Sequence, residues 1–271
     1  MTKAGIDRND FFLGAVRSLA IEAGVAILKF PNSGNLPVVK KKDNSPVTAA
    51  DLAAHSIIFQ GLHNLDANIP VISEEMPSEA VNLNMSNKFW LVDPLDGTKE
   101  FIRGSGEFTV NIALIENGEP VLGVVYAPIL DVCYYALRGL GSFKLKKKAT
   151  PQRISVVKNR ETNWTVVASR SHKDLYLEHF LERIGNHTLL NVGSSLKFCL
   201  VAEGQADVYP RFAPTSLWDT AAGQCVLEEA GGSVVQLTGK KLSYKSVSNL
   251  INPSFLATSQ SFLNFYSGLD A

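Results

Sequence analysis

The hydrophobic positions in the first half of the chain follow a helical spacing at first and a strand spacing afterwards. Residues 9–30 carry apolar side chains at helical intervals and end before Pro31, so they predict a helix, and residues 48–64 predict a second one. Short apolar runs then predict strands over residues 69–73, 88–92, 108–116, 120–126 and 132–137. The pair Asn117-Gly118 is typical of a β-hairpin turn. We therefore expect two helices followed by a mostly antiparallel sheet.

Beyond a polar, basic segment at residues 144–152, the pattern alternates between strand and helix. This segment is the predicted boundary between an N-terminal half, residues 1–147, and a C-terminal half, residues 148–271. Strands are predicted over residues 165–168, 188–191, 206–209, 233–236 and 254–258, and helices over residues 173–184, 195–203 and 219–230. Alternation of this kind indicates an α/β layer. The predicted fold class is therefore α+β in the first half and α/β in the second.

Composition restricts the possible functions of the chain more than it restricts the possible folds. The 271 residues have a formal net charge of zero, which argues against a general binder of nucleic acid polymers, so any affinity for phosphate must be local. The three cysteines lie far apart and predict neither a disulfide framework nor a zinc site. Residues 1–10 lack the apolar segment of a secretory signal, and the apolar stretch at residues 21–30 is too short to cross a bilayer. We expect a cytoplasmic protein without an integral membrane segment.

Acidic residues follow two of the predicted strands and begin one predicted helix. Glu74 follows the run at residues 69–73, Asp93 and Asp96 follow the run at residues 88–92, and Asp219 begins an Ala- and Gly-rich helix. Acids at strand ends lie at the edge of a sheet, where open α/β structures bind ligands. Carboxylate oxygens are the ligands that Mg²⁺ prefers, and a metal pair neutralises and orients a phosphate ester. Such a set suits magnesium-dependent hydrolysis of phosphate esters.

The segment at residues 93–98 (D-P-L-D-G-T) combines several of these features. We expect a Pro-containing turn that presents both aspartates and the intervening Leu95 carbonyl to one metal pair. Gly97 allows close approach of the backbone, and residues 98–102 predict one helical turn whose N–H groups suit a phosphate.

Each of these features also has a purely structural explanation. The sequence D-P-L-D-G-T is good turn chemistry without a metal, and Glu74 could lie in a solvated loop. Asp219 could be an ordinary helix N-cap, and Thr48 with Asp51 could form a capping box. Local pattern leaves both explanations open at each position.

Several segments in this order resemble one superfamily. They are residues 73–75 (S-E-E), 90–98 (W-L-V-D-P-L-D-G-T), 218–223 (W-D-T-A-A-G) and 229–232 (E-A-G-G). Together they resemble the lithium-sensitive, magnesium-dependent phosphatases of the inositol monophosphatase-like superfamily, over nearly the whole chain. The resemblance implies a layered αβαβα sandwich and two or three bound Mg²⁺ ions. The metal ligands that it implies are Glu74, Asp93, the Leu95 carbonyl, Asp96 and Asp219.

Other segments resemble the bisphosphate nucleotidase branch of that superfamily. They are residues 42–51 (K-D-N-S-P-V-T-A-A-D), 193–198 (G-S-S-L-K-F) and 207–211 (D-V-Y-P-R), with residues 169–172 (S-R-S-H) as a further wall of the same pocket. The catalytic residues implied are Asp51 paired with Thr98 to activate water, together with Glu74. The substrate contacts implied are Glu74, Leu95, Asp96, Gly97, Thr98, His172, Ser194, Lys197, Arg211 and Asp219.

A second phosphate on a nucleotide requires cationic side chains near the metal site. Lys197 and Arg211 would supply them without a basic surface, and arginine binds phosphate as a fork. Locally, both could equally be solvated charges, Ser194 could belong to an ordinary N-cap, and His172 could be a surface residue. These four assignments therefore depend on the resemblance and not on the local sequence pattern.

The predicted reaction is hydrolysis of the 3'-phosphate of adenosine 3',5'-bisphosphate to AMP and phosphate, a step of sulfur assimilation. Two alternatives stay open. One is an inositol monophosphatase or other sugar phosphatase of the same superfamily, and the other is a non-catalytic sensor of nucleotide or metal. We expect a small-molecule partner, a monomer or homodimer, and a cytoplasmic protein, either free or peripheral on the inner membrane as some relatives are.

Overall fold

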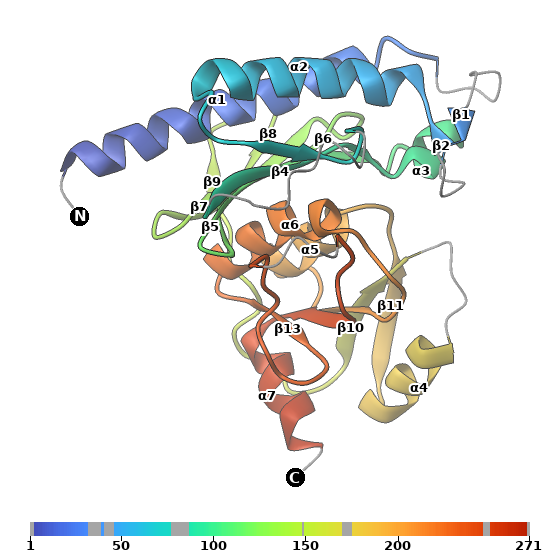
Figure 1. Cartoon of the computed structure of the whole chain (residues 1–271). Coiled ribbons are helices and arrows are strands. Elements are labelled where there is room, and N and C mark those ends of the chain that lie inside the picture. The colour runs from blue at the N-terminus through green and yellow to red at the C-terminus, as the bar shows by residue number, and fades with distance from the viewer. Residues whose placement is uncertain are drawn as a thin grey trace.

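The computed structural model describes residues 3–31, 39–40, 46–76, 87–147, 149–169, 175–245 and 250–269. Its elements stack as five layers, helix on sheet on helix on sheet on helix, from α1 and α2 at one end of the molecule to α4 and α7 at the other (Figure 1). This arrangement confirms the αβαβα sandwich implied by the resemblance.

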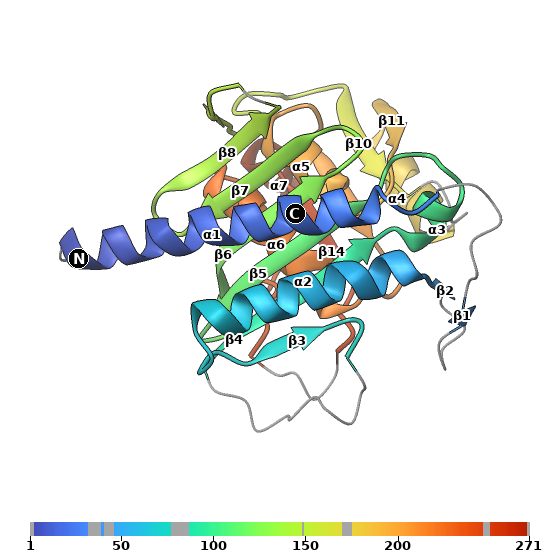
Figure 2. The same cartoon turned by 90° about the horizontal axis from the view of Figure 1, so that it is seen from above.

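The first layer consists of α1 (Lys3–Ile27) and α2 (Ala49–Leu65), which lie across the outer face of the larger sheet (Figure 2). Their inner faces bury apolar side chains at helical spacing, Val16 with Ala20 on α1 and Ile58 with Leu62 on α2. Both predicted helices are confirmed, although α1 begins earlier than the pattern indicated and ends at Ile27.

The larger sheet has seven strands in the order β3-β4-β5-β6-β7-β8-β9, and all neighbours are antiparallel except the parallel pair β3 and β4. Its strands are β3 (Val71–Ser73), β4 (Lys88–Asp96), β5 (Thr109–Glu116), β6 (Glu119–Ala127), β7 (Val132–Leu137), β8 (Gly141–Lys146) and β9 (Gln152–Arg153). Asn117 and Gly118 both have positive φ, 56° and 80°, as a type I′ hairpin requires, so this predicted turn is confirmed.

The basic segment predicted as a boundary belongs largely to the edge of this sheet. Lys144 and Lys146 lie on β8, and Gln152 pairs with Lys144 across β8 and β9. Lysines on a sheet edge protect its unpaired groups from other strands. A basic composition therefore indicated a linker where the chain forms edge strands, and the division at residue 147 stays a prediction.

The smaller sheet has the order β11-β10-β12-β14-β13 and carries α4 (Leu175–Ile184) and α7 (Gln260–Gly268) on its outer face (Figure 1). Its strands are β10 (Trp164–Ala168), β11 (His187–Asn191), β12 (Val208–Arg211), β13 (Ser233–Gln236) and β14 (Phe255–Thr258). β10 is parallel to both β11 and β12, so the carboxyl ends of these three strands meet at one edge. The sequence pattern missed α7.

The central layer consists of α5 (Leu196–Ala202) and α6 (Leu217–Glu229), which lie between the two sheets. Helix α6 approaches β6 so closely that a Cβ on Gly123 would lie 2.6 Å from the carbonyl oxygen of Ala222. This packing holds the N-terminal turn of α6 in a fixed relation to the larger sheet. Within the part of the chain that the structure describes, no helix has the length and apolarity needed to cross a bilayer.

Candidate active site

The two aspartates of the D-P-L-D-G-T segment reach the same site because of a β-bulge. β4 continues through Asp96, where the sequence predicted a turn after Val92. Asp93 pairs with Asn111 and Asp96 pairs with Thr109, so three steps along β4 match two steps along β5. Side chains alternate between the faces of a regular strand, and residues three apart would point in opposite directions. The extra residue in the bulge removes this conflict and lets both carboxylates face the same site.

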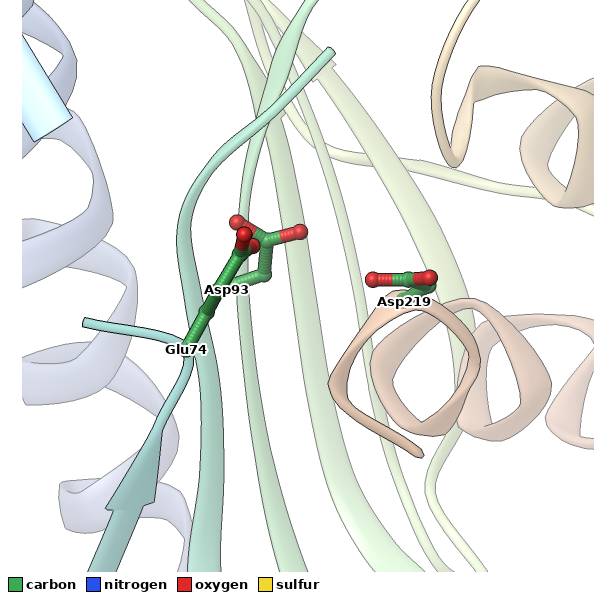
Figure 3. Close-up of side chains that lie close together, drawn as sticks. All are labelled: Glu74, Asp93 and Asp219. Carbon is green, nitrogen blue, oxygen red and sulfur yellow. The ribbon is translucent and has the colours of Figure 1, made fainter. Parts of the chain in front are cut away.

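Three carboxylates from three segments meet beside the bulge. Oxygen atoms of Glu74, Asp93 and Asp219 all lie within 4.8 Å of one another. Glu74 follows β3 and is held against β4 by its N–H, which donates to the Val92 carbonyl at 3.1 Å, while Asp219 lies in the first turn of α6. Figure 3 shows Glu74 beside Asp93, with Asp219 facing them from the helix.

The electrostatics of this cluster favour a bound cation. Burial raises the pKa of Asp93 well above its ordinary value, and the negative charges of Glu74, Asp96 and Asp219 raise it further. Burial likewise raises the pKa of Asp219, reinforced by Asp96 and Glu74. Buried like charges are unfavourable unless a cation compensates them. All three donors are carboxylate oxygens, which suit a hard cation such as Mg²⁺, so the residues present fit the metal that the resemblance implies.

Asp96 lies next to this cluster and lines the same cleft, of about 200 Å³, with Leu95 and Gly97. Its Oδ2 accepts hydrogen bonds from the Ser195 N–H at 2.6 Å and from the Ser195 hydroxyl at 2.8 Å. Gly97 has φ of 95°, the left-handed conformation that glycine adopts most easily, and it turns the chain from β4 into α3 (Thr98–Ile102).

Asp51 and Thr98 form the pair that the resemblance implied. The Asp51 side chain is buried, and its Oδ1 accepts from the Thr98 hydroxyl at 3.2 Å. The same hydroxyl lies 3.3 Å from the Leu95 carbonyl, which places the pair beside the cleft. Asp51 Oδ2 accepts from the Thr48 N–H at 2.8 Å and from the Thr48 hydroxyl at 2.6 Å, which completes the capping box of α2. Burial raises the pKa of Asp51, and these hydrogen bonds oppose the rise.

The capping bonds of these acids are compatible with their positions at the site. Asp51 caps α2 with one oxygen and contacts Thr98 with the other. Asp219 Oδ2 accepts from the Ser216 N–H at 2.8 Å as a helix cap, while the residue also belongs to the carboxylate cluster. One oxygen of each carboxylate anchors the side chain, and the anchor fixes the direction of the other oxygen.

A second pocket, of about 180 Å³, adjoins the carboxylate cleft. It lies at the carboxyl edge of the parallel strands β10, β11 and β12, where α/β sheets commonly bind ligands. Ser169, Ser194, Lys197 and Arg211 line it. The two pockets share five lining residues: Asp96, Gly97, Lys99, Glu100 and Asp219. A ligand in the second pocket is therefore next to the acids.

The two predicted cations in this pocket have different surroundings. Arg211 Nε donates to the Ala213 carbonyl at 3.0 Å and its Nη2 to the Pro214 carbonyl at 3.1 Å, which fixes the plane of the guanidinium. Lys197 is buried, and its ammonium donates to the Ser194 carbonyl and lies 5.1 Å from the centre of the Tyr209 ring. Burial, reinforced by Arg211, lowers the pKa of Lys197 to about 8. The alternative of a solvated lysine is wrong.

Of the remaining predicted residues, one lines the second pocket and the others lie outside the described part of the chain. Ser194 lines the second pocket, and its hydroxyl oxygen lies 3.2 Å from the hydroxyl oxygen of Thr109. His172 lies outside the described residues, as do residues 170–171 and residues 42–45 of the predicted segments. Two polar residues at the site that sequence analysis did not select are Ser195, which contacts Asp96, and Asn111 on β5. A polar residue at alternate positions of a buried strand, as at 109 and 111, was the available signal.

Comparisons with known proteins find similarity over nearly the whole chain. A sequence model of the inositol monophosphatase family matches residues 9–263. The chain is 50% identical over 247 residues to the 3'(2'),5'-bisphosphate nucleotidase CysQ of Salmonella typhimurium. The alignment covers 91% of this chain and 99% of that protein. The chain is 49% identical to CysQ of Escherichia coli, with 90% and 98% covered. The crystal structure of CysQ from Bacteroides thetaiotaomicron superposes with a TM-score of 0.78 at 39% identity, covering 92% of this chain and 97% of that one.

Proposed function

The chain belongs to the inositol monophosphatase family, and we propose that it is a 3'(2'),5'-bisphosphate nucleotidase, a phosphoric monoester hydrolase that converts adenosine 3',5'-bisphosphate to AMP and phosphate. The observation that carries this proposal is the shared wall between the carboxylate cleft and the pocket that contains Arg211. A bisphosphate nucleotide needs both a site for the phosphate that is hydrolysed and a cation for the phosphate that is kept. The 49–50% identical nucleotidases support the same conclusion.

We propose that two or three Mg²⁺ ions are held by Glu74, Asp93, the Leu95 carbonyl, Asp96 and Asp219. When bound, they would neutralise the phosphoryl oxygens and stabilise the leaving oxygen. The oxygen donors and the mutual repulsion of the buried acids support this assignment.

Three buried free thiols, Cys133, Cys199 and Cys225, suit a cytoplasmic location.

The proposed base is Asp51, which acts through Thr98. The Thr98 hydroxyl donates to Asp51 Oδ1, so its oxygen lone pairs are available to accept a hydrogen bond from a water beside the cleft. As that water attacks the 3'-phosphate in line, Thr98 passes the proton to Asp51. N–H groups of Gly97 and Thr98, at the turn from β4 into α3, are proposed to orient the phosphoryl oxygens.

The function is tested by assaying phosphate release from adenosine 3',5'-bisphosphate and inositol 1-phosphate side by side. We expect kcat/KM to be about 10-fold or more higher for the nucleotide, because hydrogen bonds between a cation and a phosphate contribute about 1.5–3 kcal/mol. We also expect EDTA to abolish both activities and Mg²⁺ to restore them. A preference for inositol 1-phosphate would identify a sugar phosphatase, and no Mg²⁺-dependent release from either ester would favour a sensor.

Arg211 provides a sharper test of the nucleotide pocket. Two of its five N–H groups donate to the Ala213 and Pro214 carbonyls. The other three N–H groups suit the phosphate that the enzyme does not hydrolyse. Arg211→Ala is expected to raise KM for adenosine 3',5'-bisphosphate about 10-fold to 100-fold, with a smaller change in kcat. Arg211→Lys should restore only part of the loss, because lysine lacks the planar fork.

Adenosine 3'-monophosphate is the control substrate because it lacks the second phosphate. Its KM should be nearly the same for Arg211→Ala as for the unchanged protein. An equal rise in KM for both nucleotides would show that Arg211 does not bind the second phosphate.

A further inference from the structure

Asp96 has one carboxylate oxygen surrounded by donors. Its Oδ2 accepts from the Ser195 N–H at 2.6 Å, the Ser195 hydroxyl at 2.8 Å and the Asn111 amide at 3.3 Å. These three donors surround an oxygen that has two lone pairs, so neither lone pair is left for a cation. The other oxygen, Oδ1, is therefore the one that can face a cation in the cleft, and the rotation of the carboxylate is fixed by its protein partners.

The Asn111 amide has one orientation that satisfies its neighbours. Nδ2 donates one hydrogen to Asp96 and the other to the Ser195 hydroxyl at 2.9 Å. Oδ1 accepts from the Thr109 hydroxyl at 2.9 Å. A flipped amide would place a carbonyl oxygen against the Asp96 carboxylate. Because Asn111 is only 1% exposed, water cannot replace these bonds without opening the core.

Ser195 links the two elements that carry the acids. Its hydroxyl accepts from Asn111 and has a single hydrogen, which lies between Asp96 Oδ2 at 2.8 Å and the Asp219 carbonyl oxygen at 2.8 Å. Ser195 is the N-cap residue of α5 but makes no side-chain cap hydrogen bond to that helix. The hydroxyl therefore connects the end of β4 to the first turn of α6, although an N-cap serine ordinarily bonds to its own helix.

We propose that Asn111 and Ser195 are positioning residues for the metal centre. Asn111 on β5 and Ser195 before α5 orient Asp96 and hold it in register with Asp219 across the boundary between the larger sheet and the central helices. This inference rests on the magnesium site proposed above. Partners of metal ligands that orient them typically change metal affinity or activity about 10-fold to 100-fold when removed.

The test compares Ser195→Ala and Asn111→Ala with the unchanged protein. We expect each variant to raise the Mg²⁺ concentration for half-maximal activity about 10-fold to 100-fold and to reduce the Mg²⁺-induced rise in Tm. KM for adenosine 3',5'-bisphosphate at saturating Mg²⁺ should change by no more than about two-fold. Thr258→Val is the matched control, because Thr258 is a fully buried hydroxyl that bonds to the Asp207 and Ser259 carbonyls away from the site.

The outcomes separate this inference from the function on which it rests. If the unchanged protein needs no divalent ion, the proposed function fails. If it needs Mg²⁺ and both variants keep its half-saturating concentration, only the positioning role fails. A rise in KM with unchanged Mg²⁺ dependence would make Ser195 a nucleotide contact and also overturn the inference. Ser195→Ala removes a single oxygen, so it carries the test by itself if Asn111→Ala does not fold in EDTA.

Discussion

Asp93→Asn is expected to abolish turnover while making the metal-free protein more stable. Asp93 lies in the three-carboxylate cluster, and burial and the neighbouring acids raise its pKa. A neutral amide removes the repulsion and one anionic metal ligand together. We expect a loss of about 4 kcal/mol in transition-state stabilisation, which is about 10³-fold in kcat. The Tm in EDTA should rise by about 2–4 °C for each kcal/mol of repulsion removed, and Mg²⁺ should no longer raise it.

The pH dependence of the metal-free protein has a defined sign. An acid whose folded pKa is raised stabilises the fold while it is protonated and loses that contribution as the pH rises through its ordinary pKa toward the folded one. The contribution of Asp93 should therefore make the unchanged protein in EDTA more stable when the pH is lowered from 7 toward 5. Asp93→Asn should show less of this gain. Scanning calorimetry of both proteins at the two pH values measures the difference.

Asp207→Asn is the matched control for this substitution. Asp207 is also a fully buried aspartate with a raised pKa, but its Oδ1 pairs with Arg160 at 3.2 Å and its Oδ2 accepts from the Thr165 N–H. An amide there loses the ion pair without relieving any cluster of acids. We expect it to keep kcat and not to raise Tm. If Asp93→Asn turned over substrate at a near-normal rate, Asp93 would not be a metal ligand.

The acids of the site were predictable because they occur in short sequence segments with a recognisable pattern. Asp93 and Asp96 occur in one hexapeptide, and the resemblance of the ordered segments to one superfamily predicted that Asp219 would join them. The β-bulge was not predictable from these residues, since the apolar pattern of β4 ends at Val92 and the following polar residues indicate a turn. Pairing with β5, a non-local contact, extends the strand beyond its own pattern.

The partners that orient the acids were harder to find. Asn111 is a polar residue in an apolar run, and Ser195 looks like an ordinary helix N-cap. Ser195 is 99 positions from Asp96 and 84 positions from Asn111, and Asn111 reaches Asp96 across two paired strands. No local spacing encodes these contacts. Strand β8, next to the edge strand β9, was missed for a different reason, because its lysines resemble those of a linker.

Asp51→Asn is expected to reduce kcat about 10²-fold to 10⁴-fold, the range for loss of a general base, with little change in the Mg²⁺ concentration for half-maximal activity. The geometry gives the reason. If the amide oxygen of the variant takes the place of Oδ2 and keeps the bonds from Thr48, the amide nitrogen faces Thr98. The nitrogen then donates to the Thr98 hydroxyl, so the hydrogen bond reverses and the hydroxyl can no longer pass a proton to residue 51.

Two measurements separate a base from a helix cap at this position. Thr48→Val removes the hydroxyl donor to Asp51 Oδ2 and should cost about 1 kcal/mol of stability as a lost cap, yet keep most of kcat. The pH profile supplies the second. Burial raises the pKa of Asp51, so kcat of the unchanged protein should fall on the acid side as this carboxylate is protonated, and Asp51→Asn should lack that fall in its residual activity. An acid limb that persists in the variant would assign the proton transfer to another group and leave Asp51 as the cap of α2.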